Sequence, residues 1–157
     1  MIPKGRPGDS FLHPVILGLL LLWALNDHLF KAAFANVWTG KLSDVASLAV
    51  FPLIPVCCYE IGCAWRGVEA RHTQRVLWLS LMATGAVMVG INTWQPMADS
   101  YRWGLGLLQW PFRSLWQLQN GAGAASLKPV FLTQDPTDLW TLPALVIPWW
   151  VASRPGR

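Results

Sequence analysis

The chain has few charged residues and few cysteines. Asp, Glu, Lys and Arg make up 13% of its 157 residues, which is about half of the charged share of an average soluble domain. The three cysteines all lie between residues 57 and 63, so no disulfide framework is expected. Apolar residues make up 54% of the chain, which contains 11 tryptophans. This balance excludes a disordered chain or a nucleic-acid-binding tail, and it predicts a small integral membrane protein.

The sequence also lacks the motifs of familiar catalytic sites. It contains no H-E-x-x-H zinc motif, no G-x-S-x-G nucleophile motif and no Cys-x-x-Cys pair. Residues 39–43, Thr-Gly-Lys-Leu-Ser, look like the end of a phosphate-binding loop, but the first glycine and the strand of that motif are missing. Whether the protein is an enzyme therefore stays open at this point, and the identity of any cofactor is unknown.

Four apolar segments predict four membrane-spanning helices. A helix rises about 1.5 Å per residue, so some twenty residues cross a hydrocarbon core about 30 Å thick. The fold expected is all-α: an integral membrane four-helix bundle that forms a single transmembrane domain over residues 1–157. The four expected spans cover residues 11–30, 43–65, 76–94 and 136–153. A long outer loop at residues 95–135 joins the third span to the fourth.

Basic residues and tryptophans predict that the N-terminus and the C-terminus are both cytoplasmic. Seven of the 12 Lys and Arg residues fall in three short inner segments, 1–13, 60–75 and 154–157. The other five are spread over the longer outer segments, and basic residues are enriched on the cytoplasmic side of membrane proteins. Tryptophans lie near the ends of the spans, where amphipathic rings sit at headgroup level. The expected location is the bacterial inner membrane, as a multi-pass protein.

The outer loop at 95–135 predicts an amphipathic helix that lies in the membrane interface. Arg102 and Arg113 make a fifth full span costly. Pro111 suits the first turn of such a helix. Apolar side chains then recur at three- and four-residue steps, at Leu108, Phe112, Leu115 and Trp116. This helix would either rest on lipid or cover a site as a lid.

Polar residues gather at the predicted outer ends of all four spans. Ionisable residues that face a bundle interior are candidates for function. Helix capping explains part of the pattern, because Ser43 and Asp135 suit N-cap positions and Asp44 and Asp138 suit first turns. The candidate ligand-binding residues are Asn26, Lys31, Lys41, Ser43, Asp44, Asn92, Asp135, Thr137 and Asp138, and the candidate catalytic residues are Asp27 and His28.

These residue types are compatible with several functions. Two helix N-termini together with Lys31 and Lys41 favour a lipid headgroup, another anion or an ion as ligand. An enzyme acting on a phospholipid-type substrate would use Asp27 or His28 as general base. A structural or accessory subunit would use the polar groups only as caps. A divalent metal could be held by oxygen and imidazole groups from Asp27, His28, Asp44 and Asp138.

Membrane lipid is the expected partner. A homo-oligomer is also expected, since four spans are few for a monomeric transporter. The two halves carry similar strings, Ser43 to Leu48 and Thr137 to Leu142, each followed by a pair of prolines. This similarity suggests two helical hairpins arranged as parallel repeats.

A resemblance enters at these polar strings. The chain resembles a group of small bacterial multi-pass membrane proteins with no assigned activity. Three polar strings carry this resemblance: Asn26-Asp27-His28 with Lys31, residues 39–44 and residues 135–139. The resemblance covers the first, second and fourth predicted spans. It implies a membrane bundle and supports the choice of residues, but it implies no chemistry.

The topology makes a direct prediction. Alkaline phosphatase fused after Arg157 should be inactive, because the enzyme matures only outside the cytoplasm, whereas fusion after Asn120 should give an active enzyme. Phosphatase activity in intact cells reports on which side of the membrane each fusion point lies. Activity of the C-terminal fusion would contradict the topology.

Overall fold

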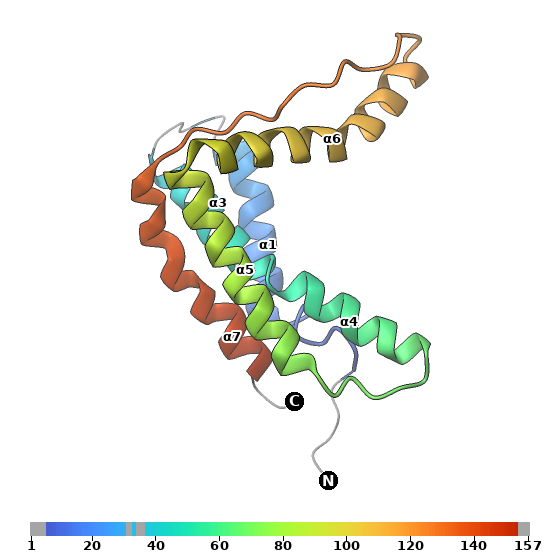
Figure 1. The fold of residues 1–157 in the computed structure, drawn as a ribbon, viewed down its shortest axis with the longest axis vertical. Helices are drawn as coiled ribbons and strands as arrows, with labels where there is room; N and C mark the ends of the chain where they lie inside the picture. The colour runs from blue at the N-terminus through green and yellow to red at the C-terminus, as the bar shows by residue number, and fades with distance from the viewer. Residues whose placement is uncertain (1–5, 31–32, 34–36, 154–157) are drawn as a thin grey trace. The chain divides into compact units, whose positions relative to one another are not determined.

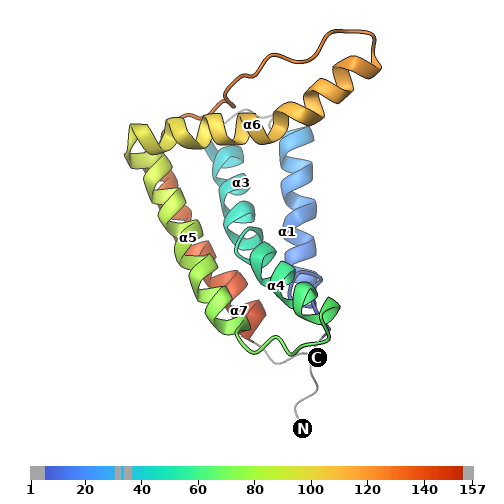
Figure 2. The ribbon, with the colours of Figure 1, turned by 45° about the vertical axis from the view of Figure 1, so that its right-hand side comes forward.

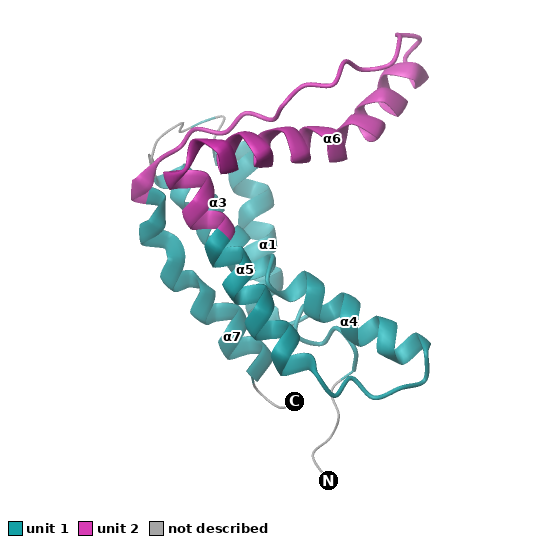
Figure 3. Ribbon diagram, viewed as in Figure 1, with its two compact units in different colours: residues 1–86, 138–157 teal, residues 87–137 magenta. Residues whose placement is uncertain are grey.

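The structure is a computed structural model that describes residues 6–30, 33 and 37–153. Within these residues every regular element is a helix, so the all-α prediction is confirmed there (Figure 1). The chain divides into two compact units (Figure 3). Unit 1 comprises residues 1–86 and 138–157, and unit 2 comprises residues 87–137.

The first helix of unit 1, α1 (Pro14–Leu25), begins with two start signals. Pro14 occupies its first position, where a missing N–H costs nothing. His13 caps it, since its Nδ1 accepts a hydrogen bond from the Val15 N–H at 3.3 Å. The helix then widens into a π-helical turn, Asn26–Phe30.

The second predicted span is divided by a proline. α3 (Val37–Val50) is followed at once by α4 (Leu53–Trp65), and Pro52 lies at the junction. Pro52 has no N–H for the carbonyl four residues before it, so the α-helical hydrogen bonds stop there. The helix also begins at Val37 rather than at Ser43 as predicted. The start predicted at Ser43 was wrong. The Ser43 side chain resembles an N-cap in the sequence, but it lies inside α3 and bonds to Asn26 and Asp27 at the end of α1.

The helix α5 (Thr73–Thr93) spans the third predicted segment. Trp38–Trp65 and Thr73–Thr93 are long and apolar enough to cross a membrane, and Pro14–Phe30 is apolar but shorter. The fourth predicted span is a 3-10 helix, η2 (Pro136–Leu145), followed by a short α7 (Val146–Ser153). Prolines inside this segment prevent a continuous α-helix. Two candidate spans are thus present in the described residues, where four were expected.

Apolar side chains from several helices form the core of unit 1. α1 and α3 lie side by side in both views (Figures 1 and 2). The residues of the core cluster are Ile16, Val50, Leu53, Val56, Leu77, Leu81 and Val151. Large apolar side chains also remain exposed on the same helices, including Leu21 at 61% and Leu79 at 71%. Helices that are apolar all round fit a lipid environment or a buried position.

Unit 2 contains one long helix, α6 (Gln95–Gln119), and an extended segment, residues 122–135, that we call the strap. The interfacial helix was predicted to start near Pro111, but Pro111 lies inside α6. Pro96 supplies the first-turn proline instead, directly after the extended residue Trp94. The predicted helix was therefore too short at its N-terminal end. Asp99, which was expected in the loop, lies in the second turn of α6.

The strap returns along α6 and is held through its backbone. The Val130 N–H donates to the Arg102 carbonyl at 3.0 Å, and Arg102 Nε donates to the Val130 carbonyl at 3.2 Å. Trp110 Nε1 donates to the Ala125 carbonyl at 2.6 Å. A Cβ atom added at Gly106 would collide with the Lys128 carbonyl oxygen. Glycine at 106 is therefore required for the close approach of the strap to α6.

We expect Gly106→Ala to loosen the strap. The added methyl group would overpack this contact, at a cost of about 1–3 kcal/mol. Hydrogen exchange at the Val130 amide should then become about fivefold faster or more. Gly104→Ala is the matched control, because no heavy atom lies within 4 Å of a Cβ at that position. Equal exchange rates in the two variants would contradict the contact.

Candidate functional site

A polar cluster joins the end of α1 to the start of α3; it comprises Asn26, Asp27, Thr39 and Ser43. Asn26 Nδ2 donates to the Thr39 carbonyl oxygen and to Ser43 Oγ, both at 2.7 Å. Ser43 Oγ in turn donates to Asp27 Oδ1 at 2.8 Å. Asn26 is fully buried, while Asp27 is exposed on its other side. The structure thus brings together three of the residues singled out from the sequence.

The π-helical turn at Asn26–Phe30 shapes the polar cluster. Consecutive residues of an α-helix point in directions about 100° apart and rarely share one partner. Asn26 and Asp27 nevertheless both bond to the hydroxyl of Ser43. The wider turn begins at these two residues, and π turns in proteins are frequent at functional sites. The irregular turn and the shared hydroxyl therefore occur at the same place.

The amide oxygen of Asn26 is the least satisfied group of the cluster. It is buried and has no hydrogen-bond partner among the residues that the structure describes. The orientation of the amide follows from its neighbours, because its nitrogen faces the Thr39 carbonyl and a flipped amide would place two acceptors together. A buried acceptor without a partner costs about 1–3 kcal/mol. Such a group marks a position where a donor belongs.

A second polar contact lies on another side of α3. Lys41 Nζ and Asp138 Oδ1 form an ion pair at 3.0 Å, with both side chains 22% exposed. Lys41 and Ser43 are two residues apart, so their side chains leave α3 about 200° apart. The pair joins α3 to η2, whereas the polar cluster joins α3 to α1. The predicted constellation is therefore divided into separate contacts.

The remaining candidates are distributed elsewhere. In unit 2, Asn92 Oδ1 accepts from the Asp135 N–H at 3.1 Å, and Asp135 Oδ1 accepts from the Thr137 N–H at 2.8 Å. The second bond is the capping geometry expected of Asp135. In unit 1, Asp44 is half-buried and lies in the second turn of α3 rather than the first, because this helix starts at Val37.

His28 is exposed in the π turn, and Lys31 lies outside the described residues. In the described part of the chain, no group of three His, Cys, Asp or Glu side chains could hold a metal ion. The four candidate metal ligands, Asp27, His28, Asp44 and Asp138, are all within this part. They do not form a three-ligand centre.

The comparisons with known proteins give no relative from which chemistry could be inferred. No family model, no curated protein and no solved structure matches the chain. The capabilities of the polar cluster therefore follow from its own groups. Asn26 Oδ1 and the Asp27 carboxylate are acceptors, and the donors of Asn26 and Ser43 are used within the cluster. Such a cluster favours a ligand that donates hydrogen bonds or carries positive charge.

Sequence reasoning missed the role of Thr39, and it did not decide whether Asp44 or Asp138 is the partner of Lys41. Thr39 and Ser43 are four residues apart, so they lie on one face of α3, and this spacing was a usable signal once the helix was extended to Val37. Lys41 and Asp138 are 97 residues apart. No local pattern could have paired them.

The ion pair between Lys41 and Asp138 should contribute to stability. Lys41→Met leaves the half-buried Asp138 without this partner, so we expect the free energy of unfolding to fall by about 1–2 kcal/mol, between surface and buried pairs. Adding Asp138→Leu should restore most of the loss. Thermal unfolding of the full chain in detergent micelles measures these changes.

Arg71→Met is the matched control for the Lys41 variant. Arg71 and Glu69 form a looser pair at 3.6 Å, with side chains 78% and 56% exposed. Exposed pairs contribute little, so this variant should melt like the wild type. If Lys41→Met also melts like the wild type, the contact between Lys41 and Asp138 does not hold η2 against α3.

Proposed function

We propose that this chain is a multi-pass protein of the bacterial inner membrane, with four spans and both termini in the cytoplasm. Two helical segments are long and apolar enough to cross a membrane: Trp38–Trp65, which combines α3 and α4, and Thr73–Thr93, which is α5. α1 with its π turn, and η2 with α7, are the elements that would complete four spans. Large apolar side chains exposed on these helices, such as Leu21, Leu79 and Met82, support lipid as their surroundings.

The function of the protein in this proposal is to bind the polar headgroup of a membrane lipid at the cluster of Asn26, Asp27, Thr39 and Ser43. The observation that carries it is the buried Asn26 amide oxygen, which has no partner among the described residues. Ser43 holds the Asp27 carboxylate close to this amide. A primary ammonium group suits these acceptors, because it offers three N–H donors and a positive charge. It would meet the exposed Asp27 carboxylate first, and since Asn26 is fully buried, a local opening of the π turn would admit it to the amide oxygen.

An anionic headgroup suits the cluster less well. Of the two lysines expected to attract an anion, Lys41 is engaged by Asp138 on another side of α3, and Lys31 lies outside the described residues. A phosphate group alone would face the Asp27 carboxylate, and two like charges at close range repel each other. The headgroup class supported best is therefore one with a primary amine, as in phosphatidylethanolamine, rather than phosphatidylglycerol.

The test uses the full chain in detergent, with native mass spectrometry to measure lipid retained. Phosphatidylethanolamine should bind more tightly than phosphatidylcholine, whose methylated nitrogen has no N–H donor. Asp27→Asn should weaken binding of phosphatidylethanolamine about tenfold or more, because a hydrogen bond to a charged group contributes about 1.5–3 kcal/mol. Its effect on phosphatidylglycerol should be small or opposite in sign.

Asp99→Asn is the matched control for charge, because Asp99 lies in α6 of unit 2 and bonds to Gln95 and Arg102. It should bind lipid like the wild type. If Asp27→Asn binds phosphatidylethanolamine as tightly as the wild type does, the proposed site is wrong. The polar cluster would then serve only to join α1 to α3, as in an accessory subunit.

A further inference from the structure

The long helix α6 has two faces that differ in what covers them. Arg102, Gly106 and Arg113 recur at four- and seven-residue steps and therefore share one face. The strap lies along this face. Arg113 Nη2 donates to the Gly106 and Lys128 carbonyl oxygens, each at 3.3 Å, and Arg102 Nε bonds to the strap at Val130. The polar side of α6 is thus occupied by the chain itself.

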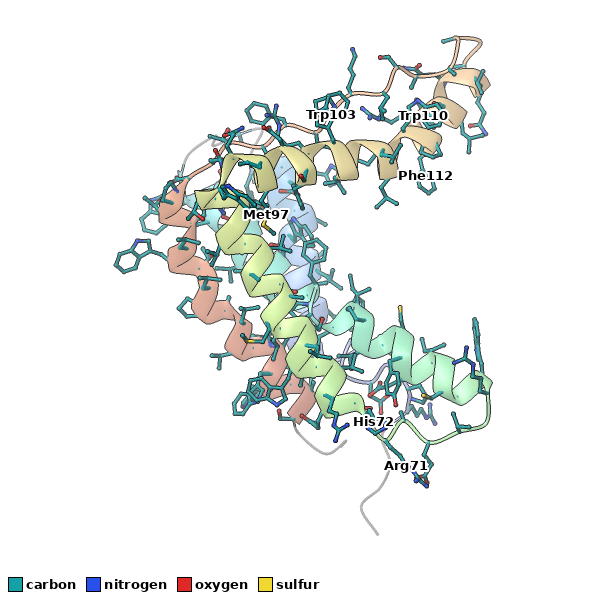
Figure 4. All side chains as sticks on the ribbon, in the orientation of Figure 1. Arg71, His72, Met97, Trp103, Trp110 and Phe112 are labelled. Atoms are coloured by element: carbon teal, nitrogen blue, oxygen red, sulfur yellow. The ribbon has the colours of Figure 1, made fainter. Side chains whose placement is uncertain are left out.

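The other face of α6 is apolar and uncovered. From Leu108 its side chains recur at three- and four-residue steps, with Leu107 beside them, and each is more than half exposed: Leu107 at 57%, Leu108 at 66%, Phe112 at 72%, Leu115 at 58% and Leu118 at 55%. In Figure 4, Phe112 projects from α6 away from the strap, whereas Trp110 lies on the strap side. A row of this size on one helix is more than scattered surface apolar residues.

We infer that this apolar face is seated in the interfacial layer of a lipid bilayer, with the strap on the aqueous side; the inference rests on the proposal that α5 crosses the membrane. α6 follows α5 after the single extended residue Trp94, and α5 is apolar enough to cross a membrane. A helix that starts where a span ends begins at the membrane surface. The charged residues Asp99, Arg102 and Arg113 keep α6 from crossing the bilayer.

Tryptophan marks lipid rather than protein as the occupant. Exposed tryptophans occur along the whole element and on more than one side of it: Trp94 at 61%, Trp103 at 51% and Trp116 at 70%. Trp103 lies on the strap side in Figure 4, and Trp116 follows Gln109 by seven residues, so both belong to the polar side or its border. Indole rings concentrate at the membrane–water boundary, where the ring meets apolar chains and the N–H meets polar groups. A helix with an apolar face, a polar face and such rings is suited to lie in the plane of the interface.

The strap gives this surface element a feature that simple amphipathic helices lack. The guanidinium of Arg113 bonds to two backbone carbonyls, and that of Arg102 to the strap and to Asp99. Both arginines are therefore engaged inside unit 2, by backbone carbonyls and by Asp99. Arg113 Nε has no hydrogen-bond partner among the described residues, but it is buried and so lies out of reach of a lipid phosphate. The seating then depends on apolar contact, so it should be the same in zwitterionic and in anionic membranes.

The test places nitroxide labels on the full chain in vesicles of phosphatidylcholine, with and without phosphatidylglycerol. Cys57, Cys58 and Cys63 are replaced by alanine, and single cysteines are introduced by Leu108→Cys, Phe112→Cys and Gln109→Cys. Labels at 108 and 112 should collide with oxygen at least threefold more than with a water-soluble nickel complex. Gln109 lies seven residues after Arg102, on the strap face, so its label should show the reverse preference.

Two outcomes would overturn the inference. Free access of the nickel complex to positions 108 and 112 would mean that the face meets water. Protection from both reagents, with spin–spin broadening, would mean that a second copy of the chain covers it. The wild-type chain provides a second measurement that needs no cysteine replacement. A carbene photolabel dissolved in the acyl chains should modify Leu107, Leu108 or Phe112 and spare Gln109, and the opposite pattern would also overturn the inference.

Discussion

The hydrogen bonds from the buried Asn26 amide to α3 are the contact on which the arrangement of unit 1 depends. The Asn26 side-chain nitrogen donates hydrogen bonds to the Thr39 carbonyl and to the Ser43 hydroxyl, and the Ser43 hydroxyl donates to the Asp27 carboxylate. In apolar surroundings, a primary amide that lost these partners would cost several kcal/mol. α1 and α3 can therefore pack in one register only. The apolar contacts at Ile16 and Val50 are compatible with many registers, whereas the amide is compatible with one.

Prolines determine where the helices of unit 1 change direction or type. Pro14 starts α1, Pro52 separates α3 from α4, and Pro143 lies within η2. Pro52 and Pro143 each remove one N–H from the helical pattern, so a carbonyl is left to find another partner, whereas Pro14 stands at a first position where no carbonyl loses its donor. The end of α4 is set differently: Gly67 adopts a positive φ of 66°, and Gly67 and Val68 donate back to Ala64 and Cys63. These local rules account for the helix boundaries.

Sequence reasoning could predict the helical class, because long apolar segments with few charges allow little else. It could also select Asn26, Asp27 and Ser43, since polar side chains at the ends of apolar helices need partners. It misplaced the start of α3, because Ser43 resembles a cap when only neighbouring residues are considered. It placed Pro111 at a helix start for the same local reason.

Long-range partners and the division into two units could not be predicted from the sequence. The pairing of Lys41 with Asp138 joins segments 97 residues apart, and the sequence alone suggested one constellation in which both took part with Asn26 and Asn92. The position of the strap along α6 depends on Gly106, a residue without chemistry of its own. What decides it is the space that the missing side chain leaves for the Lys128 carbonyl.

The way the strap is held has a consequence for how the chain can vary between species. Arg102, Trp110 and Arg113 all bind backbone carbonyls of the strap, at Val130, Ala125 and Lys128. Carbonyl oxygens are the same in every residue, so the side chains of the strap are largely unconstrained by these bonds. Selection should act instead on the helix residues that donate and on the chain length between them. The strap can thus diverge in sequence while its path along α6 is inherited unchanged.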